Sequence, residues 1–119
     1  MGSLKVSVTA GPSGPVLALA GEADVTTVAQ LDEALTPQVS GRATTLTIDA
    51  TDLRYADSAS MRALLMAAAK ITSRDGTVTL LNPQPPVARL LDLLCVDGMI
   101  AVERQAPAPG PGHEPGDSA

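Results

Sequence analysis

The strongest constraint on this sequence is the alternation of strand-like and helix-like patterns along its first hundred residues. Two short apolar segments, 4–8 and 16–20, flank a Gly-Pro-Ser-Gly turn, which predicts a β-hairpin. Strand-like and helix-like segments then alternate at 28–35, 44–49, 61–71, 77–81, 87–94 and 99–102. The predicted order, β-β-α-β-α-β-α-β, is typical of an α/β fold with a mixed sheet whose helices cover mainly one face.

Local signals predict where the helices begin and end. Asp24 or Thr26 is expected to cap the first helix, and Pro37 with Gly41 to end it. The predicted apolar stripe of the last helix consists of Val87, Leu90, Leu91 and Leu94. One domain is therefore expected at residues 1–104.

The last fifteen residues differ in composition from this domain. The segment 105–119 reads QAPAPGPGHEPGDSA, which is rich in proline and glycine and contains no large apolar side chain. Such a segment buries too little surface to offset the entropy lost on ordering. We therefore predict a disordered Pro/Gly-rich tail.

Charge and aromatic content exclude several kinds of partner. The chain has 13 acidic against 8 basic side chains, and Tyr55 is its one aromatic residue. An acidic surface repels phosphate backbones, and a single ring provides no stacking platform, so we expect no nucleic acid partner. No charge-free apolar stretch approaches the roughly 18 residues of a membrane span, and no secretory signal is recognisable. The sequence predicts no membrane insertion and a cytoplasmic location.

Catalytic and metal-binding side chains are scarce. Cys95 is the only cysteine and lies in an apolar run, where we expect a small buried side chain, and His113, the only histidine, falls in the tail. The folded part therefore has no histidine for Ser-His-Asp or Cys-His catalysis or for most transition-metal sites. We predict that the protein is not an enzyme and needs no metal or cofactor.

The most informative segment is 46–65, LTIDATDLRYADSASMRALL, in which a buried strand leads through a short loop, expected to carry Tyr55, into a helix. Asp57 or Ser58 occupies the expected N-cap position, where free backbone N–H groups favour negative charge. A phosphate added there would find hydrogen-bond donors already in place. The alternative is that Asp57, Ser58 and Ser60 only cap the helix, and that Asp49 and Asp52 are solvated or form turns.

This segment also carries a resemblance to a known family. The segments concerned are Leu46–Asp49 followed by Asp52-Leu53 and Asp57-Ser58, then Gly21-Glu22-Ala23-Asp24, and Asn82-Pro83 followed by Val87–Leu94. Together they resemble the signature of STAS domains, the anti-sigma factor antagonist family, in which an Asp-Ser-Ser/Thr-Gly-Leu element opens a helix. The likeness covers roughly residues 4–103.

The resemblance implies a STAS-like (SpoIIAA-like) fold with a mixed sheet of four to five strands flanked by helices. It also implies partner switching in transcription regulation, in which the antagonist binds a kinase-type anti-sigma factor, or a related ATP-binding regulator, and frees the sigma factor. Phosphorylation at the helix start then separates the pair, because the phosphate adds a charge of about −1.5 to −2. The partner-binding residues implied here are Asp24, Asp57, Ser58, Ala59, Ser60 and Met61.

The sequence departs from the family pattern at one consequential position. Ala59 occupies the usual phosphoacceptor position and Ser60 that of the following glycine, so the standard phosphorylation cannot occur. One explanation is a constitutive, unswitched binding module, and a second is that Ser58 or Ser60 has become the acceptor. A third is a different assembly, because STAS domains with alanine here also resemble subunits of lipid-transport ABC complexes.

A hypothesis of another class is a small ligand-binding α/β domain. Asp49, Asp52 and Asp57 follow one strand, and ligand sites of α/β folds commonly lie at strand ends. The lack of histidine in the folded part and of a glycine-rich phosphate loop weighs against this hypothesis.

Overall fold

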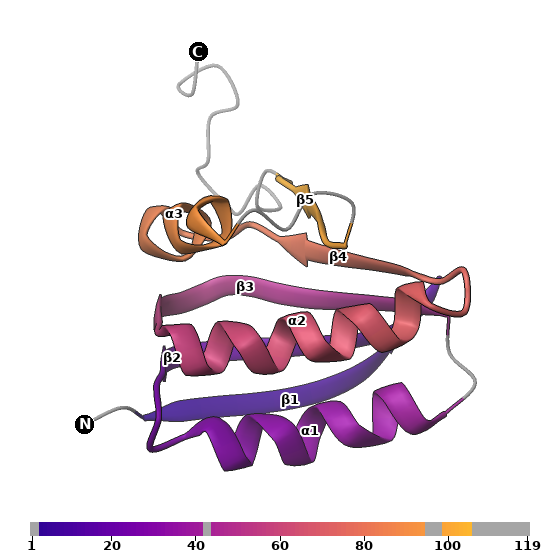
Figure 1. The fold of residues 1–119 in the computed structure, drawn as a ribbon, viewed down its shortest axis with the longest axis horizontal. Coiled ribbons are helices and arrows are strands. Elements are labelled where there is room, and N and C mark those ends of the chain that lie inside the picture. The colour runs from indigo at the N-terminus through magenta and orange to yellow at the C-terminus, as the bar shows by residue number, and fades with distance from the viewer. Residues whose placement is uncertain (1–2, 42–43, 95–98, 106–119) are drawn as a thin grey trace, which may run out of the picture.

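The computed structural model describes residues 3–41, 44–94 and 99–105. The elements in these ranges are β1 (Leu4–Gly11), β2 (Gly14–Ala23), α1 (Val28–Ser40), β3 (Thr45–Ala56), α2 (Ser58–Thr72), β4 (Thr77–Leu81), α3 (Pro85–Leu93) and β5 (Ala101–Glu103). Their order confirms the predicted α/β class (Figure 1). The predictions for Cys95, for His113 and for all of the 105–119 tail except Gln105 concern residues outside the described ranges.

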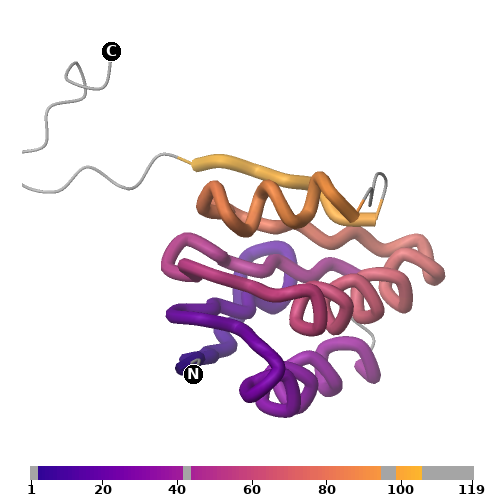
Figure 2. The backbone as a smooth tube through the Cα atoms, turned by 60° about the vertical axis from the view of Figure 1, so that its left-hand side comes forward, coloured from indigo at the N-terminus to yellow at the C-terminus, as the bar shows by residue number. Residues whose placement is uncertain are grey.

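The strands form a mixed sheet in the order β1-β2-β3-β4-β5. β1 and β2 form the predicted antiparallel hairpin, whereas β2, β3, β4 and β5 pair in parallel. This strand order places β1 and β5 at opposite edges of the sheet (Figure 2). Helices α1 and α2 lie side by side against one face of the sheet, as predicted (Figure 1). Because β2 and β3 are parallel neighbours, their carboxyl ends meet at the same end of the molecule.

The core lies between the sheet and the helices and is built without aromatic side chains. Its largest fully buried residues are Leu17, Leu19, Leu31, Leu46, Ile48, Leu53, Met61, Leu64, Ile71, Val78, Leu80 and Val87. Burial of each such side chain stabilises the fold by about 1.5–3 kcal/mol before entropy costs. The one ring, Tyr55, is 48% exposed and contributes instead to the surface.

β3 is longer than its predicted range of 44–49. Ala18 of β2 pairs with Asp49 and Ala20 with Asp52, so β3 holds an extra residue between the two pairs, and a second irregularity follows toward its carboxyl end. A bulge of this kind interrupts the regular alternation of buried and exposed residues without ending the strand. The strand therefore runs through the segment that the sequence predicts as a loop.

Helix α1 differs from its prediction at its N-cap and at Pro37, whereas Gly41 ends it as predicted. Its N-cap is Thr27, because the Asp24 carboxylate and Thr26 bind each other in the preceding turn. Pro37 lies inside the helix, where its ring removes one backbone hydrogen bond near the end, and Gly41 N still donates to Pro37 O at 3.2 Å. None of the helices in the described part of the chain is long and apolar enough to span a membrane.

Candidate partner-binding site

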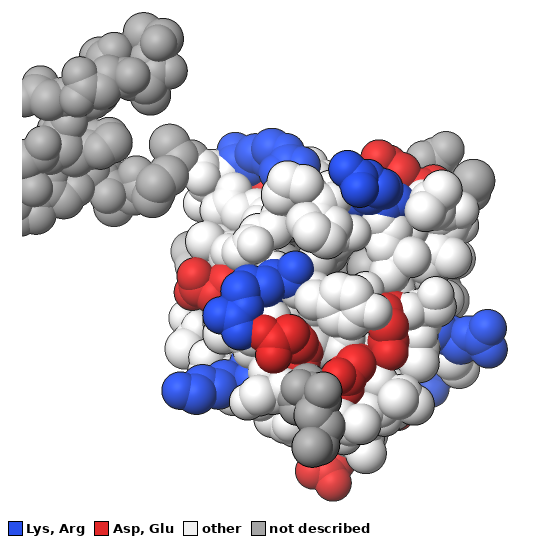
Figure 3. Space-filling model, turned by 90° about the vertical axis from the view of Figure 1, so that its left-hand side faces the viewer, with Lys and Arg blue, Asp and Glu red and all other residues white. Residues whose placement is uncertain are grey.

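Two strand-to-helix junctions lie side by side at the carboxyl ends of β2 and β3. Ala23 pairs with Ala56, so Asp24 and Asp57 follow neighbouring strand ends, and Asp57 N donates to Ala23 O at 3.0 Å. Figure 3 looks onto this end of the molecule, where acidic side chains gather between basic ones. The fold thus brings together Asp24 and Asp57, two of the residues predicted to bind a partner.

Asp57 caps α2, as predicted. Its backbone is extended, its carboxylate accepts a hydrogen bond from Ser60 N at 2.9 Å, and its carbonyl accepts one from Met61 N at 2.9 Å. The first bond satisfies a backbone donor that the first turn of a helix otherwise leaves free, and the second is the first regular bond of the helix. The cap fixes the position at which α2 leaves the sheet.

Asp24 holds the neighbouring loop by a different set of bonds. Its carboxylate accepts hydrogen bonds from the backbone N–H of Thr26, at 2.9 Å, and from the Thr26 hydroxyl. Its own N–H donates to Thr27 Oγ1 at 2.9 Å. The side chain of Asp24 therefore shapes the entry to α1 without being its N-cap.

The first turn of α2 presents only part of the predicted docking residues to solvent. Ser58 is exposed and Ala59 half-buried, whereas Ser60 and Met61 are both 0% exposed. Ser60 and Met61, which are expected to bind the partner beside these residues, are instead buried, because a helix turns the third and fourth residues of its first turn toward the sheet. Both residues support the surface from beneath.

Among the described residues, the Ser60 hydroxyl has no hydrogen-bond partner, although Ser60 is fully buried. An unsatisfied buried hydroxyl costs about 1–3 kcal/mol relative to a paired one. A fully buried hydroxyl is also out of reach of a phosphate donor, so Ser58 is the accessible hydroxyl of the two candidate acceptors.

An ion pair braces the same two strands just before the junctions. Arg54 of β3 donates through Nε and Nη2 to a carboxylate oxygen of Glu22 of β2. The hydrogen bond from Arg54 lowers the pKa of the Glu22 carboxyl below its ordinary value, and the positive charge of Arg54 adds to the effect. The stabilisation is therefore present at neutral pH and is lost as the pH falls through the lowered pKa of Glu22.

Helix α3 adds residues that the sequence reasoning missed. A hollow of about 320 Å³ separates α3 from the β3–α2 junction, and we call it the α3 hollow. Its lining residues are Tyr55, Ala56, Asp57, Ser58, Pro86, Arg89, Leu90 and Leu93. Leu93 is 72% exposed, and Leu94, predicted in the buried stripe, is the C-cap and 39% exposed. The sequence does indicate an exposed leucine here, because residues 90–94 hold more leucines than one buried stripe can contain.

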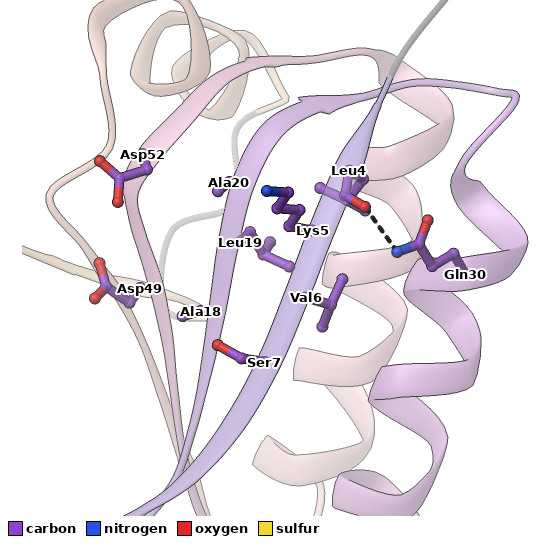
Figure 4. Close-up of a pocket in the computed structure, with 10 residues that line it drawn as sticks. All are labelled: Leu4, Lys5, Val6, Ser7, Ala18, Leu19, Ala20, Gln30, Asp49 and Asp52. Carbon is purple, nitrogen blue, oxygen red and sulfur yellow. Dashed lines mark hydrogen bonds between the residues drawn. The ribbon is translucent and has the colours of Figure 1, made fainter.

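A second hollow, of about 630 Å³, lies on the sheet beside β1 (Figure 4). Lys5 stands on one side of Ala20, and Asp49 and Asp52 stand on the other. Asp57 is not among the residues that line this hollow, so the structure separates the three carboxylates on which the ligand-binding hypothesis rests. Within the described ranges, no group of three or more His, Cys, Asp or Glu side chains is placed to hold a metal ion.

Replacement of Asp57 separates its capping role from its charge. Asp57→Ala removes the acceptor for Ser60 N and is expected to lower the free energy of unfolding by about 1 kcal/mol, whereas Asp57→Asn keeps an acceptor and should change it by only a few tenths. Urea denaturation followed by circular dichroism measures both values. Equal losses in the two variants would mean that the charge, and not the cap, stabilises the helix.

The chain was also compared with known proteins. A family model described as "Mlab, STAS domain" matches residues 6–102. Among curated protein sequences, none matches the chain closely enough to count as a relative.

Several solved structures resemble the fold. An anti-sigma factor antagonist from Mycobacterium paratuberculosis is 21% identical, with a TM-score of 0.76 over 84% of this chain and 85% of that one. The antagonist SpoIIAA in its unphosphorylated form is 21% identical, with a TM-score of 0.71 over 83% and 88% of the two chains. Bacillus SpoIIAA in the phosphorylated form is 20% identical, with a TM-score of 0.65 over 85% and 91%.

Proposed function

The chain belongs to the STAS domain family, and we propose that it is a cytoplasmic protein-interaction module of the anti-sigma factor antagonist type. In this role it binds a kinase-type anti-sigma factor, or a related ATP-binding regulator, and so regulates transcription by releasing a sigma factor. The observation that supports the proposal is the pair of neighbouring junctions, in which Asp24 and the Asp57-capped start of α2 form one polar surface.

The proposed docking surface consists of Asp24, Asp57, Ser58 and Ala59. Ser58 is exposed, and the two carboxylates provide negative charge for a basic partner surface. Ser60 and Met61 hold the helix in place beneath it. The module acts by binding, and no catalytic step is assigned to it.

We propose that this module is not switched by phosphorylation at the family's usual position. Ala59 has no hydroxyl, and Ser60, the second hydroxyl of this turn, is fully buried. Ser58 alone offers an accessible hydroxyl in the first turn of α2, which makes it the competing acceptor to test. A module without an acceptor keeps its docking surface in one state and stays available to its partner.

Titration calorimetry of the purified protein against a panel of kinase-type anti-sigma factors tests the proposed function. We expect at least one member to bind with a dissociation constant in the micromolar range or below, and Asp57→Asn, which keeps the helix cap, to weaken that binding. Failure of every panel member to bind would overturn the proposal.

A second candidate function is that of a STAS subunit in a lipid-transport ABC complex. The observation that favours it is the matching family model, whose description names Mlab. Adding ABC-type ATPase subunits to the same panel separates the two roles. Binding to an ATPase subunit and to no anti-sigma factor would select the second candidate.

A further inference from the structure

Helix α3 carries two apolar stripes: the first is buried in the core, and in the second only Leu90 also packs against the core. Val87 and Leu91, four residues apart, are buried against the rest of the domain. Pro86, Leu90 and Leu93 follow at the helical spacing of four and then three residues, and all three line the α3 hollow. A nine-residue helix therefore turns a second apolar side toward the β3–α2 junction.

The rim of the α3 hollow carries two large exposed side chains. Leu93 is 72% exposed and Tyr55 is 48% exposed, and both line the hollow from opposite elements, α3 and β3. Single exposed apolar residues are ordinary, but large ones gathered around a concave site mark interaction surfaces. Tyrosine and leucine around a small pocket form the kind of site in which one partner side chain supplies most of the binding energy.

Charges around the hollow indicate the chemistry of the occupant. Asp57 lies on the side of α2, with Asp24 at the neighbouring strand end, and Arg89 lies on the side of α3. The lining thus holds one carboxylate and one guanidinium, and Asp24 adds a second carboxylate beside Asp57, outside the lining. A basic group placed beside the hollow is attracted by this arrangement, and an acidic one on the same side is repelled.

We propose that the α3 hollow is the anchor pocket of the docking surface and accepts one large apolar side chain of the leucine type. The segment that carries this side chain has a basic residue next to it, directed at Asp57 and Asp24. The partner is the anti-sigma factor of the proposed function, on which this inference rests for the partner's identity. The occupant's chemistry rests on the lining residues and on the neighbouring Asp24, so it can be tested without the partner.

The partner-independent test uses two blocked dipeptides, N-acetyl-Arg-Leu-amide and N-acetyl-Glu-Leu-amide, titrated into the ¹⁵N-labelled full chain. We expect the arginine peptide to shift the amide signals of residues that line the α3 hollow, and the glutamate peptide to bind about tenfold more weakly. The shifts should disappear in the variant Leu93→Ala. No shift at the hollow, equal affinity for both peptides, or shifts unchanged in Leu93→Ala would overturn the inference.

The test with partner protein compares two exposed apolar residues. Leu93→Ala is expected to weaken binding to a responsive anti-sigma factor by about tenfold. Met66→Ala is the matched control, because Met66 is 59% exposed on α2 but does not line the α3 hollow.

The two tests keep the inference and the proposed function apart. Binding that Leu93→Ala and Met66→Ala leave equally strong would overturn the anchor pocket and leave the proposed function standing. A panel without any binder would overturn the proposed function, and the dipeptide titration would then decide the chemistry of the hollow alone.

Discussion

Gly21→Ala is expected to destabilise the domain by about 2–4 kcal/mol, the largest stability effect that we predict for a single methyl group. Gly21 has a φ of +100°, a conformation that side chains with a Cβ rarely adopt. An added Cβ would also overlap the carbonyl oxygen of Ser3, which accepts a hydrogen bond from Glu22 N at 2.9 Å. The substitution therefore forces the start of β1 away from the end of β2.

The control for this prediction is Gly41→Ala at the end of α1. Gly41 has a φ of −78°, and its added Cβ would lie 3.3 Å from Pro37 O, so a change within about 0.5 kcal/mol is expected. Urea denaturation of both variants gives the comparison. A loss in Gly21→Ala no larger than that in Gly41→Ala would show that the β1–β2 contact can relax around the new methyl group.

The elements that could be predicted from the sequence are those set by local chemistry. The Asp57 cap depends on a carboxylate just before an apolar helical stripe, and both are visible in the residue pattern. The β4 range 77–81 was predicted without error, because its β-branched residues follow directly on an Asp-Gly turn.

The elements that could not be predicted depend on contacts between distant segments. β3 extends past Asp49 because β2 continues to pair with it across a bulge, and a bulge breaks the period of two on which sequence reasoning relies. The hydrogen bonds of the Asn82 side chain also depend on distant segments. Its side chain accepts from Gln105 N at 2.7 Å and donates to Thr51 Oγ1 at 3.2 Å, and no short motif reports such bonds.

In the candidate site, too, some features follow from local sequence and others from the packing of distant segments. The resemblance implies Asp24 and Asp57 as partner-binding residues, which stays a prediction, and the parallel pairing of β2 and β3 places them at neighbouring strand ends. The burial of Ser60 and the exposure of Leu93 follow from the way α2 and α3 are rotated against the sheet. That rotation is a property of the packed domain, so the excess of leucines at 90–94 indicates that a leucine is exposed without showing which one.

Ala59→Ser is expected to turn the protein into a substrate for its own partner. With ATP, Mg²⁺ and a responsive anti-sigma factor, the new hydroxyl oxygen attacks the γ-phosphorus, the bond to the β-phosphate oxygen breaks, ADP leaves, and the hydroxyl proton passes to solvent. The product carries an added charge of about −1.5 to −2 between Asp57 and the rest of the first turn. Because the docking surface is already acidic, we expect the phosphorylated variant to bind its partner at least about tenfold more weakly.

Intact-protein mass spectrometry and calorimetry measure the two effects, with Ala63→Ser as the matched control. Ala63 is half-buried one turn further along α2, so it tests whether any added hydroxyl on this helix is modified. The wild type is expected to gain no phosphate, since Ala59 has no hydroxyl and Ser60 is fully buried. Phosphate on the wild type that disappears in Ser58→Ala would contradict the unswitched module and assign the switch to Ser58, the exposed hydroxyl at the start of α2.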